Sequence, residues 1–286
     1  MELDLDSIKA NKSTPELLEF SIINVDKPSG PTSFTVSQFV KNALGLRKTS
    51  HMGTLDPAVS GILPVTLNRA CRLSDYLMHR NKKYVGIMRL HSLVPEEQLK
   101  ETIQKFVGKI IQLPPVRSRV KRAEREREVK SFEILEQEET DILFKTEVQA
   151  GTYIRKICHD MGGALGVGAH MLELRRTQAG AFHEPAATLY ELEAAVDAYK
   201  KGDERQLRVL LVPGEIIGTL LPLVNVAHDA VKKLYTGSPL FFSMTDDPTP
   251  FEKGEKIAVF DNDIFIGCYR VVHEGSVMAV PEFVLN

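Results

Sequence analysis

The sequence predicts an α+β fold followed by a small all-β domain at the C-terminal end. Helical and strand-like patterns follow each other in an irregular order before residue 222, which favours α+β over a doubly wound sheet. After that point the pattern becomes β-rich, with runs at 255–261, 264–272 and 276–285. The length of 286 residues and the 26% of charged residues are ordinary for one large or two smaller globular domains.

The separate elements follow from periodicity and turn chemistry. Residues 1–20 are polar and are expected to form an N-terminal arm, and 21–33 read as a strand with a Pro/Gly turn. From Thr35 a one-sided apolar pattern predicts a helix that Gly45 ends. The other expected elements are a loop at 48–61, a short helix around 70–77, a strand at 84–90, a helix at 95–107, paired strands at 129–136 and 141–149, and a helix at 152–165 with Thr152 as its N-cap.

Several classes of protein are excluded by simple features. No clean run of about 18 apolar residues occurs, so a membrane span is not expected, and the acidic N-terminus does not resemble a signal peptide. Cys71, Cys158 and Cys268 are far apart and form no CxxC pair, which argues against a disulfide framework or a zinc ribbon. We therefore expect a cytoplasmic protein without a metal site.

The net charge of −2 hides an uneven distribution along the chain. Residues 24–90 carry ten basic and three acidic side chains, whereas residues 183–286 carry nine basic and sixteen acidic ones. A basic block in a nearly neutral chain fits a surface that faces a polyanion, but a solvated charged face would explain it equally well.

The most distinctive stretch is HMGTLDPAVSGIL at 51–63. It places Asp56 on a glycine-flanked loop between basic pairs at 47–48 and at Arg69 and Arg72, where a carboxylate stays ionised and can act as a nucleophile or a base. Asp before Pro is also a common turn starter, and for an isolated Asp-Pro that structural explanation is the better one.

The complete set of motifs favours a reactive role for Asp56 over an ordinary Asp-Pro turn. DKPSGPTS (26–33), the stretch at 51–63, KKYVG (82–86), GTYIRKICHDMG (151–162) and GVGAHMLELRRTQAGAF (166–182) together resemble the TruB family of pseudouridine synthases, in the right order. This family includes a bacterial tRNA T-arm enzyme, archaeal guide-RNA synthases and eukaryotic dyskerin. The resemblance covers most of residues 20–190, and the run of motifs is very specific.

Departures from the bacterial pattern indicate the branch. Arg117 follows the paired prolines where bacterial enzymes have a tyrosine, and HSLVPEE (91–97) and GAH (168–170) are typical of the archaeal and dyskerin branch. The sequence has no Lys-rich tail of the kind found in nucleolar homologues. The chain thus resembles the archaeal catalytic subunits of H/ACA RNA-guided pseudouridine synthases.

The resemblance implies a fold and a mechanism. The fold would be a catalytic domain with a mixed, mainly antiparallel sheet and a C-terminal PUA pseudobarrel. A target uridine would be flipped out of the RNA, its glycosidic bond broken, the base turned, and C5 joined to the same ribose carbon. Asp56 would attack the sugar or abstract a proton from it, Arg155 would pair with Asp56, and Tyr84 would stack on the base and offer its hydroxyl. The reaction is an isomerisation, so no cofactor is expected.

The resemblance also implies RNA contacts. His51 would lie near the displaced nucleotide, while Ile154 and Leu174 would wall the pocket, although core packing is the simpler role for an isolated Ile or Leu. Residues 117–130 hold seven Lys or Arg and three Glu, which alone fits an exposed hairpin and in this family fits a loop that closes over RNA. The further expected RNA-binding residues are Lys82, Arg117, Arg119, Lys121 and Arg122.

The expected organisation is an arm at 1–20, a catalytic domain at 21–221 and a PUA RNA-binding domain at 222–286. Expected partners are tRNA or rRNA substrates, an H/ACA guide RNA and the small companion proteins of the archaeal particle, with no membrane. The alternatives are a stand-alone tRNA synthase and a non-catalytic RNA-binding scaffold that retains the fold. Intact Asp56, Tyr84 and Arg155 argue against the scaffold, which needs none of them.

Overall fold

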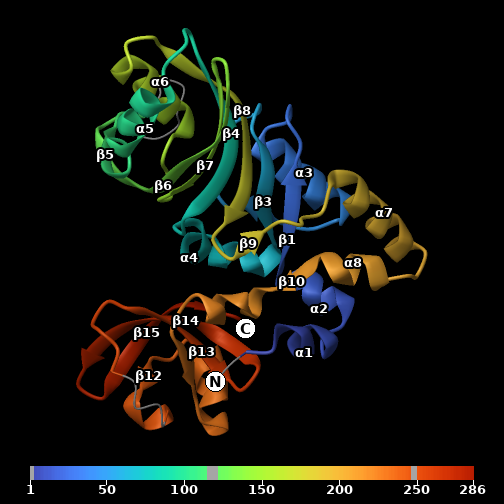
Figure 1. Ribbon diagram of the computed structural model, residues 1–286. Coiled ribbons are helices and arrows are strands. Elements are labelled where there is room, and N and C mark those ends of the chain that lie inside the picture. Colours follow the sequence, from blue (N-terminus) through green and yellow to red (C-terminus); the bar gives the residue numbers. More distant parts are fainter. Residues whose placement is uncertain (1–2, 115–121, 246–249) are drawn as a thin grey trace.

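A computed structural model describes residues 3–114, 122–245 and 250–286, and it contains two β-sheets (Figure 1). Ten strands of the described chain form the large sheet. From one edge to the other its main path runs through β10 (Leu211–Pro213), β1 (Ser21–Lys27), β3 (Ser60–Leu67), β8 (Ala169–Ala179), β4 (Lys82–Leu90), β7 (Asp141–Val148), β6 (Arg125–Glu138) and β5 (Gly108–Gln112). Two short strands, β2 (Thr49–His51) and β9 (Phe182–His183), pair with β3 and β8.

The large sheet is mixed but mainly antiparallel, as predicted. Its one parallel pair in the described chain joins β3 to β8, where Ser60 lies opposite Arg175 and Gly61 opposite Arg176. A Cβ atom on Gly61 would lie 2.2 Å from the carbonyl oxygen of Arg176, and the φ of Gly61 is +100°. Only glycine allows the two strands to approach so closely here.

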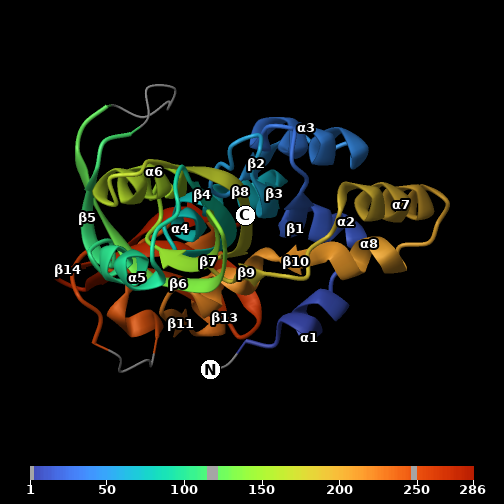
Figure 2. The ribbon, with the colours of Figure 1, turned by 45° about the horizontal axis from the view of Figure 1, so that its top comes forward.

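Helices cover the two halves of this sheet separately (Figures 1 and 2). On the side of β4 to β7 lie α5 (Glu96–Gln104) and α6 (Ile154–Ala164), while α3 (Ser33–Ala43), α7 (Leu189–Lys200) and α8 (Arg205–Leu210) lie beside β1 and β3. The predicted helix after Thr35 is confirmed: the Thr32 side chain caps α3, and Val36 and Val40 are buried beneath it. A 3-10 turn (Asn68–Leu73) and α4 (Ser74–Met78) form the predicted short helical segment before β4.

The N-terminal segment differs from the expected polar arm, because it forms two helices that pack on the sheet. They are α1 (Leu5–Ala10) and α2 (Thr14–Glu19), and they bury Ile8 and Leu17. Ser13 and Glu16 form a reciprocal capping box at the start of α2. This spacing of Ser and Glu was a helix signal in the sequence, and the two leucines that follow Glu16 give the helix its apolar face.

Two further expectations need correction. The segment at 48–61 is not a loop throughout, because its first residues form β2 and its last residues begin β3. The helix expected from Thr152 begins at Ile154 with Tyr153 in the N-cap position, and the Thr152 hydroxyl instead donates to the Gln149 carbonyl. The predicted strands at 129–136 and 141–149 are confirmed as the antiparallel pair β6 and β7.

The second sheet is smaller and lies at the C-terminal end (Figure 1). Its order is β11 (Leu223–Asn225), β13 (Lys256–Asp261), β14 (Ile264–Glu274), β15 (Val277–Val284) and β12 (Leu240–Phe241). The three predicted β-runs correspond to β13, β14 and β15, and Asn262, with a φ of +49°, makes the tight turn between the first two. With the large sheet, this confirms the α+β prediction.

The two sheets share buried side chains. Phe20, directly before β1, stacks on Phe265 of β14 with ring centroids 5.4 Å apart. Ile22 and Ile217 belong to the same apolar cluster as Phe260 and Phe265 of the second sheet. Because this contact is a packed core and not a wet surface, the orientation of the two sheets is fixed by burial.

Candidate active site

Asp56 lies on the connection between β2 and β3. Residues of the motif at 26–33 hydrogen-bond the backbone of this connection. The Ser33 hydroxyl accepts from Leu55 N at 2.8 Å and donates to Leu55 O at 3.0 Å. The ammonium of Lys27, which is fully buried at the end of β1, donates to Pro57 O at 3.0 Å. The backbone on both sides of Asp56 is therefore fixed, while its carboxylate remains half exposed.

The structure brings Asp56 and Arg155 together from distant parts of the chain. Arg155 is the second residue of α6, and its Nη2 lies 2.8 Å from Asp56 Oδ2. The side chains are 57% and 50% exposed, respectively, so a substrate can reach both. The ion pair gives the Asp56 carboxylate a preferred orientation at a position that a substrate can reach.

Tyr84 lies on β4 on the face that α5 and α6 cover, and it is 8% exposed. On the neighbouring strand β8, Leu174 is paired with Gly86 and is buried on the same face. Ile154, the first residue of α6, is also buried and belongs to the same apolar cluster as Tyr84 and Leu174. These residues form an apolar surface beside a tyrosine ring, which suits the stacking of a flipped base.

Arg176 is the main residue of this region that the sequence reading left out. It is 1% exposed, and it donates from Nε to Ile62 O at 2.7 Å and from Nη2 to Gly53 O at 2.9 Å. Tyr84 lies opposite Arg176 in the register of β4 and β8. Burial lowers the pKa of Arg176. The only sequence signal was an arginine pair in RRTQAG, of which one member had to face inward on a strand.

Lys82 and His51 lie around Arg176, and neither has a freely exposed charge. The Lys82 ammonium donates to the carbonyls of Met78 and Arg80, each at 2.5 Å, and burial together with the charge of Arg176 lowers its pKa to about 8. The structure thus places Lys82 in the wall of the site and not on an RNA-facing surface. Burial and then Arg176 also lower the pKa of His51, whose Nε2 lies 3.3 Å from the Thr54 hydroxyl.

The basic loop is only partly described. Arg122 is exposed and lies just before β6, in keeping with an RNA contact. The other three predicted contacts, Arg117, Arg119 and Lys121, lie outside the described residues. The role of this loop therefore stays a prediction.

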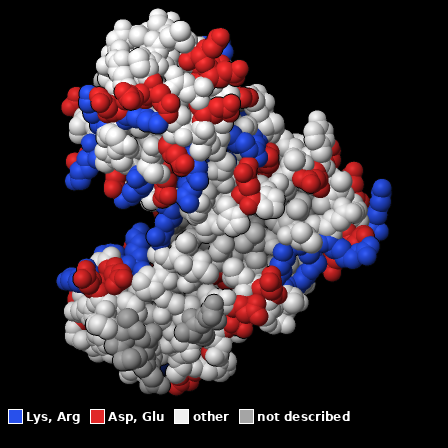
Figure 3. All heavy atoms as spheres, in the orientation of Figure 1, with Lys and Arg blue, Asp and Glu red and all other residues white. Residues whose placement is uncertain are grey.

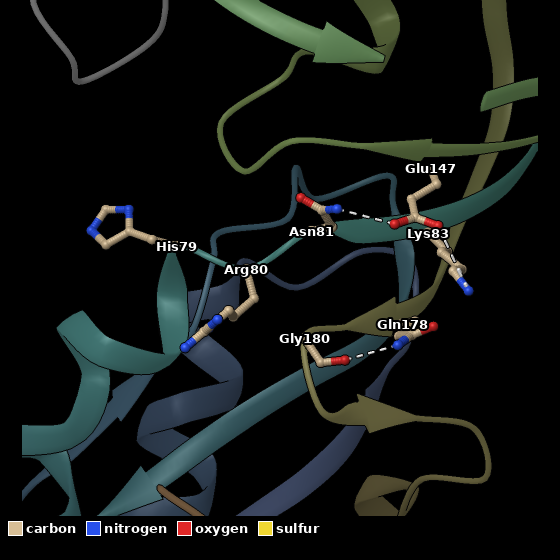
Figure 4. Close-up of a pocket in the computed structure, with 7 residues that line it drawn as sticks. All are labelled: His79, Arg80, Asn81, Lys83, Glu147, Gln178 and Gly180. Carbon is tan, nitrogen blue, oxygen red and sulfur yellow. Dashed lines mark hydrogen bonds and ion pairs between the residues drawn. The ribbon is translucent and has the colours of Figure 1, made fainter. Parts of the chain in front are cut away.

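A polar cavity of about 290 Å³ lies elsewhere on the large sheet (Figure 4). Three of its lining residues, Lys83, Glu147 and Gln178, are register partners on β4, β7 and β8. Side chains alternate along a strand, so these three point to the face opposite Tyr84. The other lining residues are His79, Arg80, Asn81 and Gly180. This cavity is therefore separate from the Asp56 site.

The described residues lack two other kinds of feature. Outside 1–2, 115–121 and 246–249, no group of three or more His, Cys, Asp or Glu side chains is placed to hold a metal ion. Within the same part of the chain, no helix is long and apolar enough to cross a membrane.

Comparison with known proteins identifies the class to which this fold and site belong. The profile of the N-terminal domain of TruB family pseudouridylate synthases matches residues 41–97, and that of the tRNA pseudouridylate synthase B C-terminal domain matches 155–217. A probable tRNA pseudouridine synthase B of Methanothermobacter thermautotrophicus is 44% identical over 225 residues, which are 78% of this chain and 69% of that protein. Its counterpart in Thermococcus kodakarensis is 47% identical over 227 residues, 78% of this chain and 67% of that protein.

Solved structures agree over almost the whole chain. The crystal structure of a Cbf5-Nop10-Gar1 complex matches with a TM-score of 0.89 at 37% identity and covers 96% of this chain and 88% of that one. An H/ACA RNP bound to a substrate RNA containing 2′-deoxyuridine matches with a TM-score of 0.89 at 35% identity, over 97% of this chain and 89% of that one. The fold and the relatives define a pseudouridine synthase. The chain belongs to the TruB family, and the predicted archaeal branch is confirmed.

Proposed function

We propose that this chain is the catalytic subunit of an H/ACA particle and isomerises uridines in RNA that a guide selects. The observation that carries the proposal is the ion pair between Asp56 and Arg155, at the open edge of an apolar surface that contains Tyr84. Support for the assembly comes from the solved relatives, which are complexes with Nop10, with Gar1 or with a substrate RNA.

The chemistry assigned to the site follows from the positions of its residues. The flipped base stacks on Tyr84 between the apolar side chains of Ile154 and Leu174. The C1′–N1 bond breaks, the uracil turns in place, and C5 forms the new bond to C1′. C5 loses its proton and N1 takes up a proton, so the reaction is an isomerisation and no external group is consumed. Asp56 acts on the ribose by attack at C1′ or by taking a ribose proton, and Arg155 orients it for either step.

We assign RNA positioning to the parts around this site. The cations at 24–90, the loop that contains Arg117, Arg119, Lys121 and Arg122, and His51 are proposed to contact phosphates or the displaced nucleotide. Figure 3 shows Lys and Arg side chains around the hollow between the upper lobe and the C-terminal part, a distribution of charge that suits a polyanion. Residues 222–286 are proposed to form a PUA-type RNA-binding domain next to a catalytic domain at 21–221.

Residues 222–286 carry nine acidic and five basic side chains, a net charge of −4, which suggests that the C-terminal sheet recognises shape more than charge. Part of the RNA would then be positioned by companion proteins. A stand-alone action on the tRNA T-arm is the second candidate, and the names of the curated archaeal relatives favour it. A cytoplasmic location completes the proposal, since all three cysteines are free.

Release of tritium from C5-labelled uridine tests the proposal. The full chain is assayed on tRNA and on a guide–target duplex, each with and without the small companion proteins. Guided action predicts that companions raise turnover of the guided target sharply. Equal turnover of guided target by the isolated chain would overturn the need for companions, and activity on tRNA alone would favour the stand-alone enzyme. Absence of release from every substrate would leave the scaffold as the better explanation.

A further inference from the structure

The guanidinium of Arg176 joins three segments that each carry a part of the site. It donates to Gly53 O on the connection that leads to Asp56, and to Ile62 O on β3 just after that connection. On β4, Tyr84 lies directly opposite Arg176 in the strand register. One planar group therefore binds the backbone on both sides of Asp56 and lies next to the tyrosine.

Backbone packing places Arg176 where it can do this. In the parallel pair of β3 and β8, Gly61 lies opposite Arg176 with no room for a Cβ atom between them. The Cβ position of Gly53, with φ at +80°, lies 3.2 Å from Nη1 of Arg176. The two glycines on either side of Asp56 are thus the positions at which the chain approaches the arginine.

The buried charge of Arg176 is unfavourable for the stability of the fold. Among the described residues no hydrogen bond or ion pair joins Arg176 to a carboxylate, and two more cations, Lys27 and Lys82, are buried nearby. The positive charge of Arg176 lowers the pKa of both lysines, after the effect of their own burial. A buried unpaired charge destabilises a fold, so apolar packing would serve stability better at this position.

We propose that Arg176 is a positioning residue of the synthase, which sets the Tyr84 hydroxyl and the Asp56 connection in register with each other. It does not touch the substrate, because it is almost completely buried. Two backbone acceptors in different directions suit the planar fork of a guanidinium, whose donors an ammonium on a flexible stem cannot reproduce. The inference rests on the proposed function.

Arg176→Lys tests the inference, with Arg175→Lys as the matched control. Arg175 is the preceding residue and points to the other face, where it pairs with Asp26 and Glu184. We expect Arg176→Lys to lower the single-turnover rate constant at saturating RNA by more than tenfold, with the dissociation constant for RNA changed less than threefold. Arg175→Lys should leave the rate constant within threefold of wild type. Unchanged turnover in Arg176→Lys would overturn the inference.

A double-mutant cycle separates positioning from a purely structural role. If Arg176 acts through Tyr84, Arg176→Lys should lower the rate much less in a Tyr84→Phe background than in the wild type. Full additivity of the two effects would contradict this coupling. Wild-type protein without activity would instead contradict the proposed function itself, so the two failures are distinguishable.

A second measurement needs no change at Arg176 and decides the matter if Arg176→Lys does not fold. The Nε proton that Arg176 donates to Ile62 O should exchange slowly and give its own ¹⁵N resonance in nuclear magnetic resonance spectra. In Tyr84→Phe this resonance should shift and its proton should exchange faster, whereas in Arg175→Lys it should not. An unchanged resonance in Tyr84→Phe would overturn the inference.

Discussion

Arg155 Nη2 lies 2.8 Å from Asp56 Oδ2, and both side chains are at least half exposed. An exposed ion pair of this kind contributes only about 0.2–1 kcal/mol to stability. Its presence at the edge of an apolar surface is therefore explained better by orientation of a reactive carboxylate than by stabilisation of the fold. Arg205 and Asp203 form a second exposed pair far from the site, which provides a matched control.

Asp56→Asn should abolish pseudouridine formation while the fold and the affinity for RNA are retained, because an amide is neither a nucleophile nor a base. Tritium release and a filter-binding titration on the same preparation measure the two properties. Asp203→Asn should behave as the wild type. Activity of the Asp56 variant above a few per cent of wild type would remove this residue from the mechanism.

Arg155→Lys should lower turnover by about tenfold or more, since lysine keeps the charge but presents it as a compact ammonium on a flexible stem, which orients the carboxylate less well. Thermal unfolding should hardly change, because an exposed pair contributes little. Arg205→Lys makes the same substitution in the control pair and should affect neither property. Equal turnover in the two variants would show that the orientation of Asp56 does not depend on Arg155.

Tyr84→Phe keeps the stacking ring and loses the hydroxyl. The rate constant at saturating RNA should therefore fall by about tenfold or more, while the Michaelis constant stays within a few fold. Tyr190→Phe on α7 is a suitable control, since its side chain is highly exposed. A raised Michaelis constant with normal turnover would mean that the hydroxyl serves binding only.

If the exposed Arg122 contacts a phosphate, Arg122→Ala should weaken RNA binding and reduce the magnitude of the slope of log K against log salt by about one. Lys256→Ala on the second sheet should leave the slope unchanged, because Lys256 already has an ion-pair partner in Glu282. Binding titrations over a range of salt concentrations measure both slopes. Identical slopes for wild type and Arg122→Ala would remove Arg122 from the RNA contacts.

Stability should depend on pH through Lys82. Burial and Arg176 lower its folded pKa from 10.5 to about 8, so between these values the unfolded chain binds a proton that the folded chain lacks. The contribution of Lys82 to the free energy of unfolding therefore rises with pH across this window and is lowest below about pH 8. Denaturant titrations at several pH values measure the free energy of unfolding of wild type and of Lys82→Met. The value for wild type minus the value for Lys82→Met should rise with pH. A constant difference would contradict the buried, perturbed lysine.

Local patterns in the sequence predicted much of the fold. The helix that contains Val36 and Val40 and the hairpin at Asn262 depend on neighbouring residues only, so periodicity and turn chemistry were sufficient. The central strand β8 was not predicted, because the polar run ELRRTQ gives no regular alternation and two irregularities interrupt the register of β8 with β4. Arg176 was missed for the same reason, since its burial depends on how β3, β4 and β8 come together.

The site itself was reached through family resemblance and not through spacing. Asp56 and Arg155 are brought together by the fold, and neither residue alone differs from an ordinary turn or a solvated helix end. The helices at the N-terminus were predictable from the capping box of Ser13 and Glu16, but the polar composition of the segment favoured an arm. Composition was a poorer guide here than the specific cap.

The apolar contact between the two sheets fixes the distance between the C-terminal sheet and the Asp56 site. Phe20 stacked on Phe265, and Arg80 bonded to the Leu220 carbonyl, leave little freedom between the C-terminal sheet and the large sheet that carries Asp56. If the C-terminal sheet binds one part of a folded RNA, only the nucleotide at this fixed distance from the bound part would reach Asp56. The choice of uridine would then depend on this distance. Lengthening or shortening the RNA between the bound part and the target would bring a different nucleotide to the carboxylate.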